Sequence, residues 1–371
     1  MKVLVTGGAG FIGSHTVDAL LNGGYEVKVL DNLLPPVHRD GKPDYLPRDV
    51  EFIEGDVRNK AAMTKALQGV EAVFHLAAYQ GFLPDYSHFF HTNTVGTAML
   101  FEVIVEKKLA IRKIIVASSQ AVYGEGRHRC PEHGDVYPPA RPLEKLMAGK
   151  WDVVCPHCGR PCVARLTDES VVNPQTQYAI SKYTQEMIAL NLGKRHGIPV
   201  VCLRYSITQG PRQSFYNAYS GILRIFTVRL LNERPPVVYE DGLMQRDYIH
   251  IKDVVAANLL VFEKEEADYQ VYNVGSGRPT TVLEYASRLK EYLGVPVEPA
   301  LPGEFRLGDV RHIISDNTKL KSLGWSVKYG LEDIIRDYVQ WARSFGKIED
   351  YFARAEKELK LSGAVRGGGK R

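Results

Sequence analysis

The first fifteen residues constrain the fold most, because they place glycines between an apolar segment and a helical pattern. They include KVLVTGGAGFIGSH, in which Gly8, Gly10 and Gly13 have the spacing Gly-x-Gly-x-x-Gly. Such glycines permit a tight turn, a close approach of the backbone to a diphosphate, and close packing of a helix on a strand. The sequence therefore predicts a strand, a phosphate-binding turn and a helix, in that order.

An acidic residue follows the next apolar segment. Asp31 comes after the predicted strand Glu26 to Leu30, eighteen residues beyond Gly13. A carboxylate at this position accepts hydrogen bonds from both ribose hydroxyls and repels a 2′-phosphate, so NAD is favoured over NADP. Asp56 and Val57, after the third predicted strand, are expected to meet the adenine, although an aspartate in an ordinary turn is the alternative.

Short β-branched segments alternate with helical patterns through the first half of the chain. Besides Glu26 to Leu30, the predicted strands are Lys2 to Thr6, Val50 to Glu54, Ala72 to Leu76 and Lys113 to Ser118. Strands separated by helices pair in parallel through right-handed crossovers, so the sequence predicts an α/β protein with a Rossmann-type doubly wound parallel sheet.

The predicted domains follow this change of pattern. Residues 1–207 are expected to form an NAD-binding Rossmann domain, which carries a Cys-rich, zinc-knuckle-like insertion at 125–172. Residues 208–362, with shorter signals and Pro-rich stretches, are expected to form mainly a smaller C-terminal substrate-binding lobe. The Gly-rich residues 363–371 are predicted to be a disordered tail.

A tyrosine and a lysine have the spacing of a base and its activating cation. Tyr178 and Lys182 lie four residues apart in a predicted helix, with Thr176 available as its N-cap. Residues at i and i+4 share one helix face, and an ammonium group beside a phenol lowers the phenol pKa from about 10 towards neutrality. Tyr178 is therefore expected to act as a base, although this spacing also occurs by chance.

Composition excludes several classes of partner. The 47 Lys and Arg residues against 43 Asp and Glu give a net charge of only +4, too mild for a nucleic-acid-binding protein. No segment approaches the ~18 uncharged apolar residues of a membrane helix, and glycines interrupt the apolar start before a signal-peptide core could form. We therefore expect a cytoplasmic protein with no membrane partner.

Four of the five cysteines lie in the predicted insertion, within the 53 residues that separate Gly124 from Tyr178. A structureless loop longer than ~15 residues is uncommon in a compact domain, so something is expected to order this one. Two copies of the pattern Cys-Pro-x-(Cys/His)-Gly, CPEHG and CPHCG, supply four ligands for a structural zinc. The ligands predicted by this pattern are Cys130, His133, Cys155 and Cys158.

Two alternatives to this ligand set stay open. Cys162 is a spare cysteine in the first interpretation, but it completes an all-thiolate site if His133 is not a ligand. A loop of reduced cysteines without metal is the other alternative.

Beyond the glycine turn, six further motifs follow one another along nearly the whole chain. They are His75–Ala78 (HLAA), Asn93–Gly96 (NTVG), Ser118–Gly124 (SSQAVYG), the pair Tyr178 and Lys182, Asp241–Tyr248 (DGLMQRDY) and Tyr272–Gly277 (YNVGSG). Together with TGGAGFIG at Thr6–Gly13, they resemble the extended short-chain dehydrogenase/reductase family, in its nucleotide-sugar epimerase and dehydratase group.

This resemblance implies an enzyme that binds NAD and a nucleotide-sugar substrate, and a homodimer formed through the helices after Asn93 and Tyr178. It implies Ser119, Tyr178 and Lys182 as catalytic residues. The implied cofactor-binding residues are Gly7, Gly10, Phe11, Ile12, Gly13, Asp31, Asn32, Asp56, Val57, Leu76, Ala77, Ala78, Asn93, Ser118, Tyr178, Lys182 and Tyr205. The implied substrate-binding residues are Ser119, Gln120, Tyr239, Arg246, Arg306 and Asp309.

Three sequence positions narrow the implied reaction. Gln120-Ala121 stands where the family's dehydratases carry Asp-Glu, and Ile207 stands where its UDP-glucose 4-epimerases carry Asn. The run Tyr205–Ser214 (YSITQGPRQS) is instead similar to the dTDP-L-rhamnose 4-epimerases. The resemblance therefore implies NAD-dependent 4-epimerisation through a 4-keto intermediate, from dTDP-L-rhamnose to dTDP-6-deoxy-L-talose.

Other functions of the same scaffold stay open. A UDP-sugar 4-epimerase and a dTDP-4-keto-sugar reductase would need the same core residues. A non-catalytic NAD-sensing protein could use the cysteine insertion as a docking surface, but the intact Ser119, Tyr178 and Lys182 argue against it.

Overall fold

A parallel sheet forms the centre of the structure, a computed structural model that describes residues 1–35, 37–217 and 221–367. Its strands are β1 (Lys2–Thr6), β2 (Glu26–Asp31), β3 (Glu51–Glu54), β4 (Ala72–His75), β5 (Lys113–Ser119), β9 (Val200–Tyr205) and β12 (Gln270–Val274). They pair in parallel in the order β12-β9-β5-β4-β1-β2-β3. The five strands predicted in the first half are confirmed to within one residue at each end.

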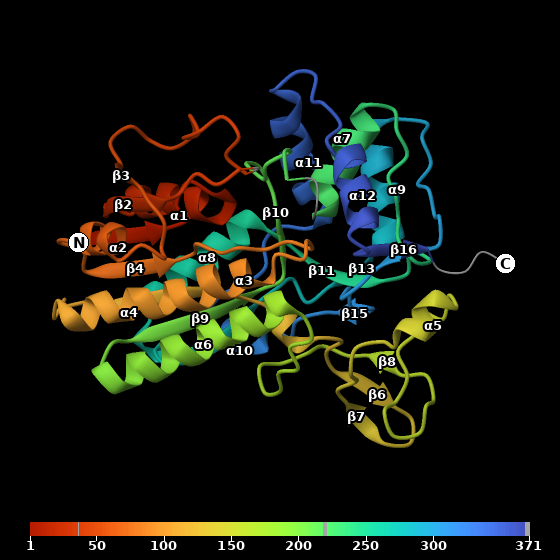
Figure 1. Cartoon of the computed structure of the whole chain (residues 1–371), viewed down its shortest axis with the longest axis horizontal. Helices are drawn as coiled ribbons and strands as arrows, with labels where there is room; N and C mark the ends of the chain where they lie inside the picture. The colour runs from red at the N-terminus through yellow and green to blue at the C-terminus, as the bar shows by residue number, and fades with distance from the viewer. Residues whose placement is uncertain (36, 218–220, 368–371) are drawn as a thin grey trace.

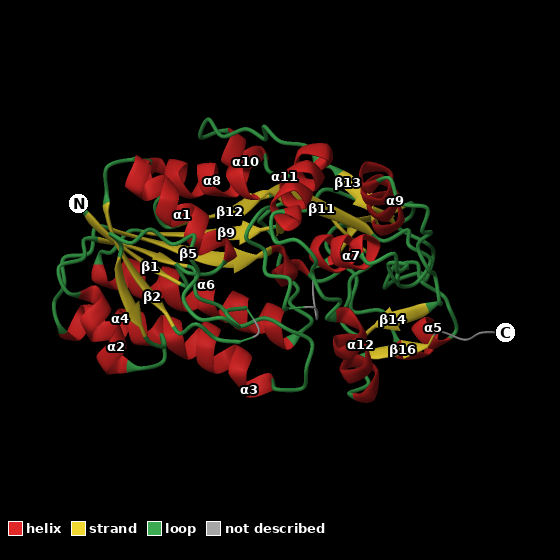
Figure 2. Ribbon diagram, turned by 90° about the horizontal axis from the view of Figure 1, so that it is seen from above, coloured by secondary structure: helices red, strands yellow, loops and turns green. Residues whose placement is uncertain are grey.

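Helices cover both faces of this sheet (Figure 2). One face carries α1 (Phe11–Asn22) and α8 (Ile251–Glu263), and the other carries α2 (Lys60–Leu67), α4 (Gly96–Glu106) and α6 (Gln177–His196). Alternate residues of β1 enter the two cores, with Val3 and Val5 on one side and Leu4 on the other. Because both faces are buried, the strands read as continuous apolar runs. Within the described ranges, no helix is long and apolar enough to cross a membrane.

The second half of the chain builds a separate hydrophobic core beside the carboxyl ends of the large sheet. Its small sheet contains β10 (Ile207–Gln209), β11 (Gln245–His250), β13 (Pro279–Thr281) and β15 (His312–Ile313). Its helices are α7 (Ile222–Leu231), α9 (Val282–Leu293), α11 (Leu331–Arg343) and α12 (Phe352–Leu361).

Short helical elements also occur elsewhere in the chain, in the connections between the longer elements. They include α3 (Tyr86–Phe89), η1 (Phe90–Val95), η2 (Gln120–Tyr123), η3 (Glu265–Ala267) and α10 (Thr318–Lys321).

The boundary predicted after residue 207 does not separate the two cores completely. The chain returns after β11 to add α8 and then β12 to the large sheet, where β12 pairs with β9. Phe262 of α8 packs edge-on against Phe74 of β4, so the return is part of the central core. Residues 208–362 therefore supply both the second core and one edge of the first.

The C-terminal tail contains a strand that the sequence did not predict. Val365–Gly367 form β16, which pairs antiparallel with β14 (Glu304–Arg306). The prediction of disorder from residue 363 is therefore wrong for this strand, because Val365 is buried and pairs with Arg306 of β14, 59 residues earlier in the chain. Residues 368–371, which belong to the same prediction, lie outside the described residues.

The cysteine insertion is an ordered subdomain at one end of the molecule, below β15 in Figure 1. It contains an antiparallel sheet of β6 (His128–Cys130), β7 (Gly134–Val136) and β8 (Val163–Ala164), and α5 (Leu143–Met147) lies in the connection from β7 to β8. The backbone of Thr167 then bonds to Ile314 and Asp316, at N–O distances of 2.9 Å each. This pairing joins the end of the insertion to the second half of the chain.

Candidate functional site

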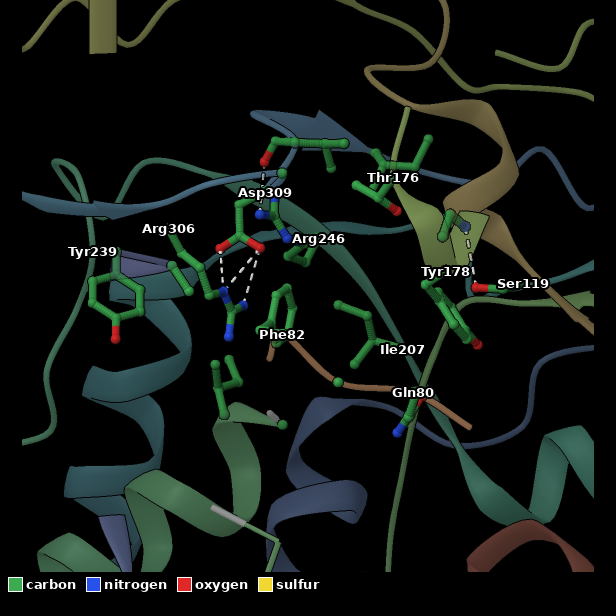
Figure 3. A pocket seen from close by; sticks show the side chains of 18 of the residues that line it. Gln80, Phe82, Ser119, Thr176, Tyr178, Ile207, Tyr239, Arg246, Arg306 and Asp309 are labelled. Carbon is green, nitrogen blue, oxygen red and sulfur yellow. Dashed lines mark hydrogen bonds and ion pairs between the residues drawn. The ribbon is translucent and has the colours of Figure 1, made fainter. Parts of the chain in front are cut away.

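A cavity of about 740 Å³ lies where the carboxyl ends of β1, β5 and β9 face the second core (Figure 3). Parallel α/β sheets bind ligands at this edge. The predicted site residues that line it are Phe11, Ile12, Ser118, Ser119, Gln120, Tyr178, Tyr205, Tyr239, Arg246, Arg306 and Asp309. One continuous space therefore contains residues from the glycine turn, the tyrosine helix and the arginine-bearing loops.

The glycine turn is too tight for any side chain at its last glycine. A Cβ atom on Gly13 would lie 2.0 Å from the carbonyl oxygen of Gly7. A Cβ atom on Gly7 would lie 2.8 Å from the Cα of Ala77, so the segment after β4 packs directly on the turn. The predicted close packing of helix, turn and strand is therefore present, with Leu76 and Ala77 against the turn.

The carboxylate of Asp31 is held beside this turn. It accepts hydrogen bonds from the backbone N–H groups of Ala9 and Leu33, at 3.0 and 2.9 Å, and its residue is 7% exposed. Nearby, burial raises the pKa of Asp56, but hydrogen bonds from Arg58 and Asn32 outweigh it and lower the value to about 2. Both carboxylates are thus held in place by hydrogen bonds near the carboxyl ends of β2 and β3, and the low pKa of Asp56 keeps that group ionised.

The tyrosine predicted to be catalytic lies on a helix that begins where the sequence predicted. The Thr176 hydroxyl accepts a hydrogen bond from the N–H of Ala179 at 3.2 Å and caps α6. Tyr178 then projects into the cavity next to Ser119, at the end of β5 (Figure 3). The Ser119 hydroxyl hydrogen-bonds to the phenol, and it also accepts from the N–H of Ala121 at 3.1 Å.

The electrostatic effect expected from Lys182 is wrong for this arrangement. Burial raises the pKa of Tyr178, and the Ser119 hydrogen bond lowers it only in part. The Lys182 ammonium instead donates to the side chain of Gln185, and burial lowers the Lys182 pKa to about 7. Although the tyrosine ring faces the cavity, surrounding protein desolvates the phenol, and only the Ser119 hydroxyl opposes the resulting rise in pKa.

Three residues predicted to bind the cofactor have side chains that form hydrogen bonds with other residues of the chain. The amide of Asn93 accepts from the N–H of Tyr79 at 2.8 Å and donates to the Ser181 hydroxyl at 2.9 Å. Ser118 donates to the carboxylate of Glu186, and Tyr205 donates to Asn258 at 2.7 Å. These side chains support the walls of the site and hold the tyrosine helix in place.

At the other end of the cavity, two arginines lie near an aromatic wall. Arg306 pairs with Asp309 at 3.0 Å, and its guanidinium lies 3.6 Å from the centre of the Phe82 ring. Arg246 donates to the backbone carbonyl of Val310 at 2.7 Å. This end thus concentrates positive charge around one loop, residues 306–311.

Phe82 and Tyr86 of this cavity belong to the aromatic group Tyr79, Phe82, Tyr86, Phe89 and Phe90, which the sequence offers either as a wall of the sugar pocket or as ordinary core packing. Nothing local to Phe82 indicates its contact with Arg306. Gln213 and Arg366 also line the cavity, from a loop and from β16. The available signals were only the aromatic run after Tyr79 and the polar residues that follow β10.

Comparison with known proteins identifies the family. The sequence matches the NAD dependent epimerase/dehydratase family over residues 3–150 and 155–275. The chain belongs to this family. The dTDP-L-rhamnose 4-epimerase of Burkholderia thailandensis is 34% identical over 348 residues, which cover 92% of this chain and 94% of that protein.

Two solved structures of UDP-glucose 4-epimerases are also similar. The Thermotoga maritima enzyme with UDP-glucose has a TM-score of 0.77 and 34% identity, and the match covers 93% of this chain and 99% of that one. The Thermus thermophilus enzyme in complex with NAD has a TM-score of 0.72 and 31% identity, with coverage of 94% and 100%. The likeness therefore extends over the sheet, the second core and the cavity between them.

In this member of the epimerase/dehydratase family, several residues that line the cavity carry a buried polar atom without a protein partner. Among the described residues, the side-chain oxygens of Gln120, Gln213, Tyr239 and Tyr248 have no hydrogen-bond partner. Burial raises the pKa of Tyr239 to about 12, so its hydroxyl stays protonated and can donate. Because an unsatisfied buried polar group costs about 1–3 kcal/mol, these atoms mark positions for a polar ligand.

The structure also brings together the four predicted metal ligands of the insertion. The ligand atoms of Cys130, His133, Cys155 and Cys158 all lie within 4.8 Å of one another. The Cys130 Sγ atom is 3.7 Å from both the Cys158 Sγ and the His133 Nδ1. Cys162 packs against this cluster but lies outside the group of four.

The backbone of the two knuckles prepares these thiols for a cation. The N–H groups of His133 and Glu132 lower the pKa of Cys130 to about 6, which favours the thiolate. In the second knuckle the N–H of His157 donates to the Cys155 sulfur at 3.4 Å. Gly134 and Gly159 end the two copies with the same φ of +71°, so the repeated sequence forms a repeated backbone turn.

Proposed function

We propose that this protein is an NAD-dependent nucleotide-sugar 4-epimerase that interconverts dTDP-L-rhamnose and dTDP-6-deoxy-L-talose. The observation that carries the proposal is the single cavity that has Tyr178 and Ser119 at one end and Arg246 and Arg306 at the other (Figure 3). A sugar joined to a nucleoside diphosphate has its reacting carbon and its anionic group separated in this way. The 34% identical rhamnose 4-epimerase supports the choice of deoxysugar.

The residues around the glycine turn fit a dinucleotide. The N-terminus of α1 carries no acidic side chain in its first turn, and its N-cap is Gly10, so backbone N–H groups are available to a diphosphate. Asp31 would accept from the adenosine ribose, and Phe11 and Ile12 would line the diphosphate. When bound, NAD supplies a reversible hydride acceptor for the sugar C4 position.

Tyr178 transfers the proton of the sugar 4-hydroxyl, and Ser119 orients Tyr178 for this transfer. Tyr178 takes this proton as the C4–H bond breaks, and it returns the proton after the 4-keto sugar has presented its opposite face. The Ser119 hydroxyl shares a hydrogen bond with the phenol and so orients it. Lys182, one turn along α6, is assigned to the cofactor instead, because its ammonium donates to Gln185 and does not lower the Tyr178 pKa.

The end of the cavity that would hold the nucleotide favours a diphosphate. The identity of the base is a matter for experiment. Arg246 and Arg306 supply cations, with Asp309 orienting Arg306 and Tyr239 offering its hydroxyl. Near the sugar, Ile207 gives an apolar contact that suits the 6-methyl group of a deoxysugar. A UDP-sugar 4-epimerase is the second candidate, supported by the Thermotoga structure with UDP-glucose.

The cysteine insertion is proposed to hold a structural zinc. Tetrahedral zinc with bonds of about 2.3 Å separates its sulfur ligands by about 3.8 Å, and the Cys130–Cys158 distance of 3.7 Å fits this geometry. Four protein ligands leave no open position for catalysis, so the ion would serve only to order the insertion.

A homodimer is proposed to form through α4 and α6. These adjacent helices expose Val105, Ile180 and Met187, which are 39%, 42% and 48% exposed, and Val95 adjoins them at 43%. Burying such a stripe against a second copy would remove it from water.

We expect the hydrogen at C4 to return to the same sugar. When dTDP-L-rhamnose deuterated at C4 is incubated in ordinary water with excess unlabelled NADH, the talose product should retain the deuterium in full, because a tightly held cofactor receives and returns it. Loss of deuterium to free NADH, measured by mass spectrometry, would identify a ketoreductase instead. Tyr178→Phe should lower turnover at least about a hundredfold with NAD still bound.

The Asp31 carboxylate should determine cofactor preference. The protein is expected to bind NAD more tightly than NADP, and Asp31→Ala should weaken NAD binding about 10- to 100-fold, as loss of a charged hydrogen-bond acceptor predicts. Fluorescence titration of both cofactors measures this, and Asp49→Ala, at an exposed position, is the matched control. Equal affinity of the unchanged protein for NAD and NADP would contradict the role of Asp31.

Elemental analysis of the purified protein should find about one zinc per chain. Cys155→Ser should lose the zinc, because it removes one of four ligands, whereas Cys162→Ser should retain it. Zinc loss from Cys162→Ser with retention in His133→Ala would favour the all-thiolate site, and zinc retained in Cys155→Ser would exclude both ligand sets.

Light scattering should give the mass of a dimer. The double variant Ile180→Glu, Met187→Glu should be monomeric, since two carboxylates on the α6 face cannot be buried without a partner charge. Leu361→Glu, at a position 78% exposed on α12, should remain dimeric. A monomeric parent protein would refute the proposed interface.

A further inference from the structure

One arginine of the cysteine insertion is buried among residues of the second half of the chain. The side chain of Arg141 is 5% exposed, and the side chains of its partners Glu125 and Glu240 are 2% and 1% exposed. Its guanidinium bonds to Glu125 at 3.0 Å and to both carboxylate oxygens of Glu240, at 2.9 and 3.0 Å. Arg141 therefore makes a bidentate pair that crosses from the insertion to the loop after Tyr239.

The same guanidinium reaches the loop that carries the proposed diphosphate ligands. Its Nη2 atom donates to the backbone carbonyl of Asp309 at 2.8 Å. The side chain of Asp309 orients Arg306, and Arg246 holds the same loop from the cavity side through the carbonyl of Val310. Residues 306–311 are thus fixed between an arginine of the site and an arginine of the insertion.

A second buried arginine repeats this connection from the opposite direction. Arg311, at the end of the loop, donates to Glu240 at 3.0 Å and to Asp241 at 2.6 and 2.7 Å. It also donates to Asp152 of the insertion at 3.2 Å, and its backbone N–H donates to Glu125 at 2.7 Å. Arg141 and Arg311 therefore share the buried carboxylates of Glu125 and Glu240 where insertion and loop meet.

The cysteine knuckles lie next to these contacts in the chain. Arg141 also donates to the carbonyl of Trp151, which directly precedes Asp152. The hairpin that begins there is closed by backbone bonds from Cys162 to Val153 and from Cys155 to Arg160, at 3.0 and 2.8 Å. Ordering of the knuckles therefore orders the segment that contacts Arg141 and Arg311.

We propose that Arg141 is a positioning residue for the nucleotide diphosphate, through which the metal-ordered insertion holds the 306–311 loop in its binding conformation. This inference rests on the proposed nucleotide-sugar function. Arg141 itself does not line the cavity; it acts on Arg306 through the backbone of Asp309. The insertion thus contributes to substrate affinity without supplying a ligand.

Arg141→Lys tests the proposal, because lysine keeps the charge between the two glutamates but cannot also reach the Asp309 carbonyl with a planar fork. Calorimetry should show dTDP binding about tenfold weaker than in the parent protein, with NAD content unchanged. KM for the nucleotide sugar should rise while kcat stays near the parent value. Arg160→Lys, an exposed arginine of the same insertion, is the matched control and should bind dTDP normally.

A second variant tests the proposal if Arg141→Lys fails to fold. Arg141→Met combined with Glu125→Gln removes one charge of each sign, and it should weaken dTDP binding to the same extent. Removing the metal from the parent protein with a chelator should also weaken dTDP binding while NAD stays bound. Unchanged dTDP affinity in the folded Arg141 variants would overturn the proposal and leave the proposed function intact, whereas a parent protein that binds neither dTDP nor UDP would overturn both.

Discussion

The approach of Gly13 to the carbonyl of Gly7 is the contact on which the rest of the site depends. No side chain fits at Gly13, where a Cβ atom would lie 2.0 Å from that oxygen, so α1 starts directly against β1. Asp31, the last residue of β2, fixes this glycine turn, because its carboxylate accepts a hydrogen bond from the N–H of Ala9 at 3.0 Å. One compact backbone arrangement therefore positions both the helix terminus and the carboxylate that a dinucleotide needs.

A buried polar network holds the tyrosine helix against this frame. Arg204 of β9 pairs with Glu186 of α6 at 2.7 Å, with both side chains less than 5% exposed. Arg204 also donates to the Tyr123 hydroxyl at 2.9 Å, which donates to Asn273 of β12 at 2.6 Å. Since breaking one member of such a pair leaves a buried charge, the network fixes α6 relative to the sheet. The position of Tyr178 is thus set by strands from both halves of the chain.

The sequence was sufficient for features encoded by neighbouring residues. The first five strands, the cap at Thr176 and the cysteine knuckles all depend on patterns within about a dozen residues, and the structure has them where they were predicted. A resemblance carried by ordered motifs supplied the rest of the family assignment. Local chemistry was decisive in each of these cases.

What could not be predicted depends on residues that are distant in the chain. Arg141 contacts Asp309 across 168 positions, and β16 pairs with β14 across 61 positions, so no local pattern indicates either contact. The prediction that Lys182 lowers the Tyr178 pKa was wrong because it considered a neighbouring charge and not the desolvation that the folded protein imposes on the phenol. Long-range packing determines both the tail and the electrostatics.

The proposed function requires the cavity to join a hydride-transfer site to a dTDP-deoxysugar site in one polypeptide. The most direct measurement follows dTDP-L-rhamnose, UDP-glucose and UDP-glucuronic acid by NMR after incubation with the purified protein and no added cofactor. We expect conversion of dTDP-L-rhamnose to its C4 epimer, to an equilibrium mixture, without net consumption of NAD. Conversion of the UDP-sugars alone, or of none of the three by protein that contains NAD, would contradict it.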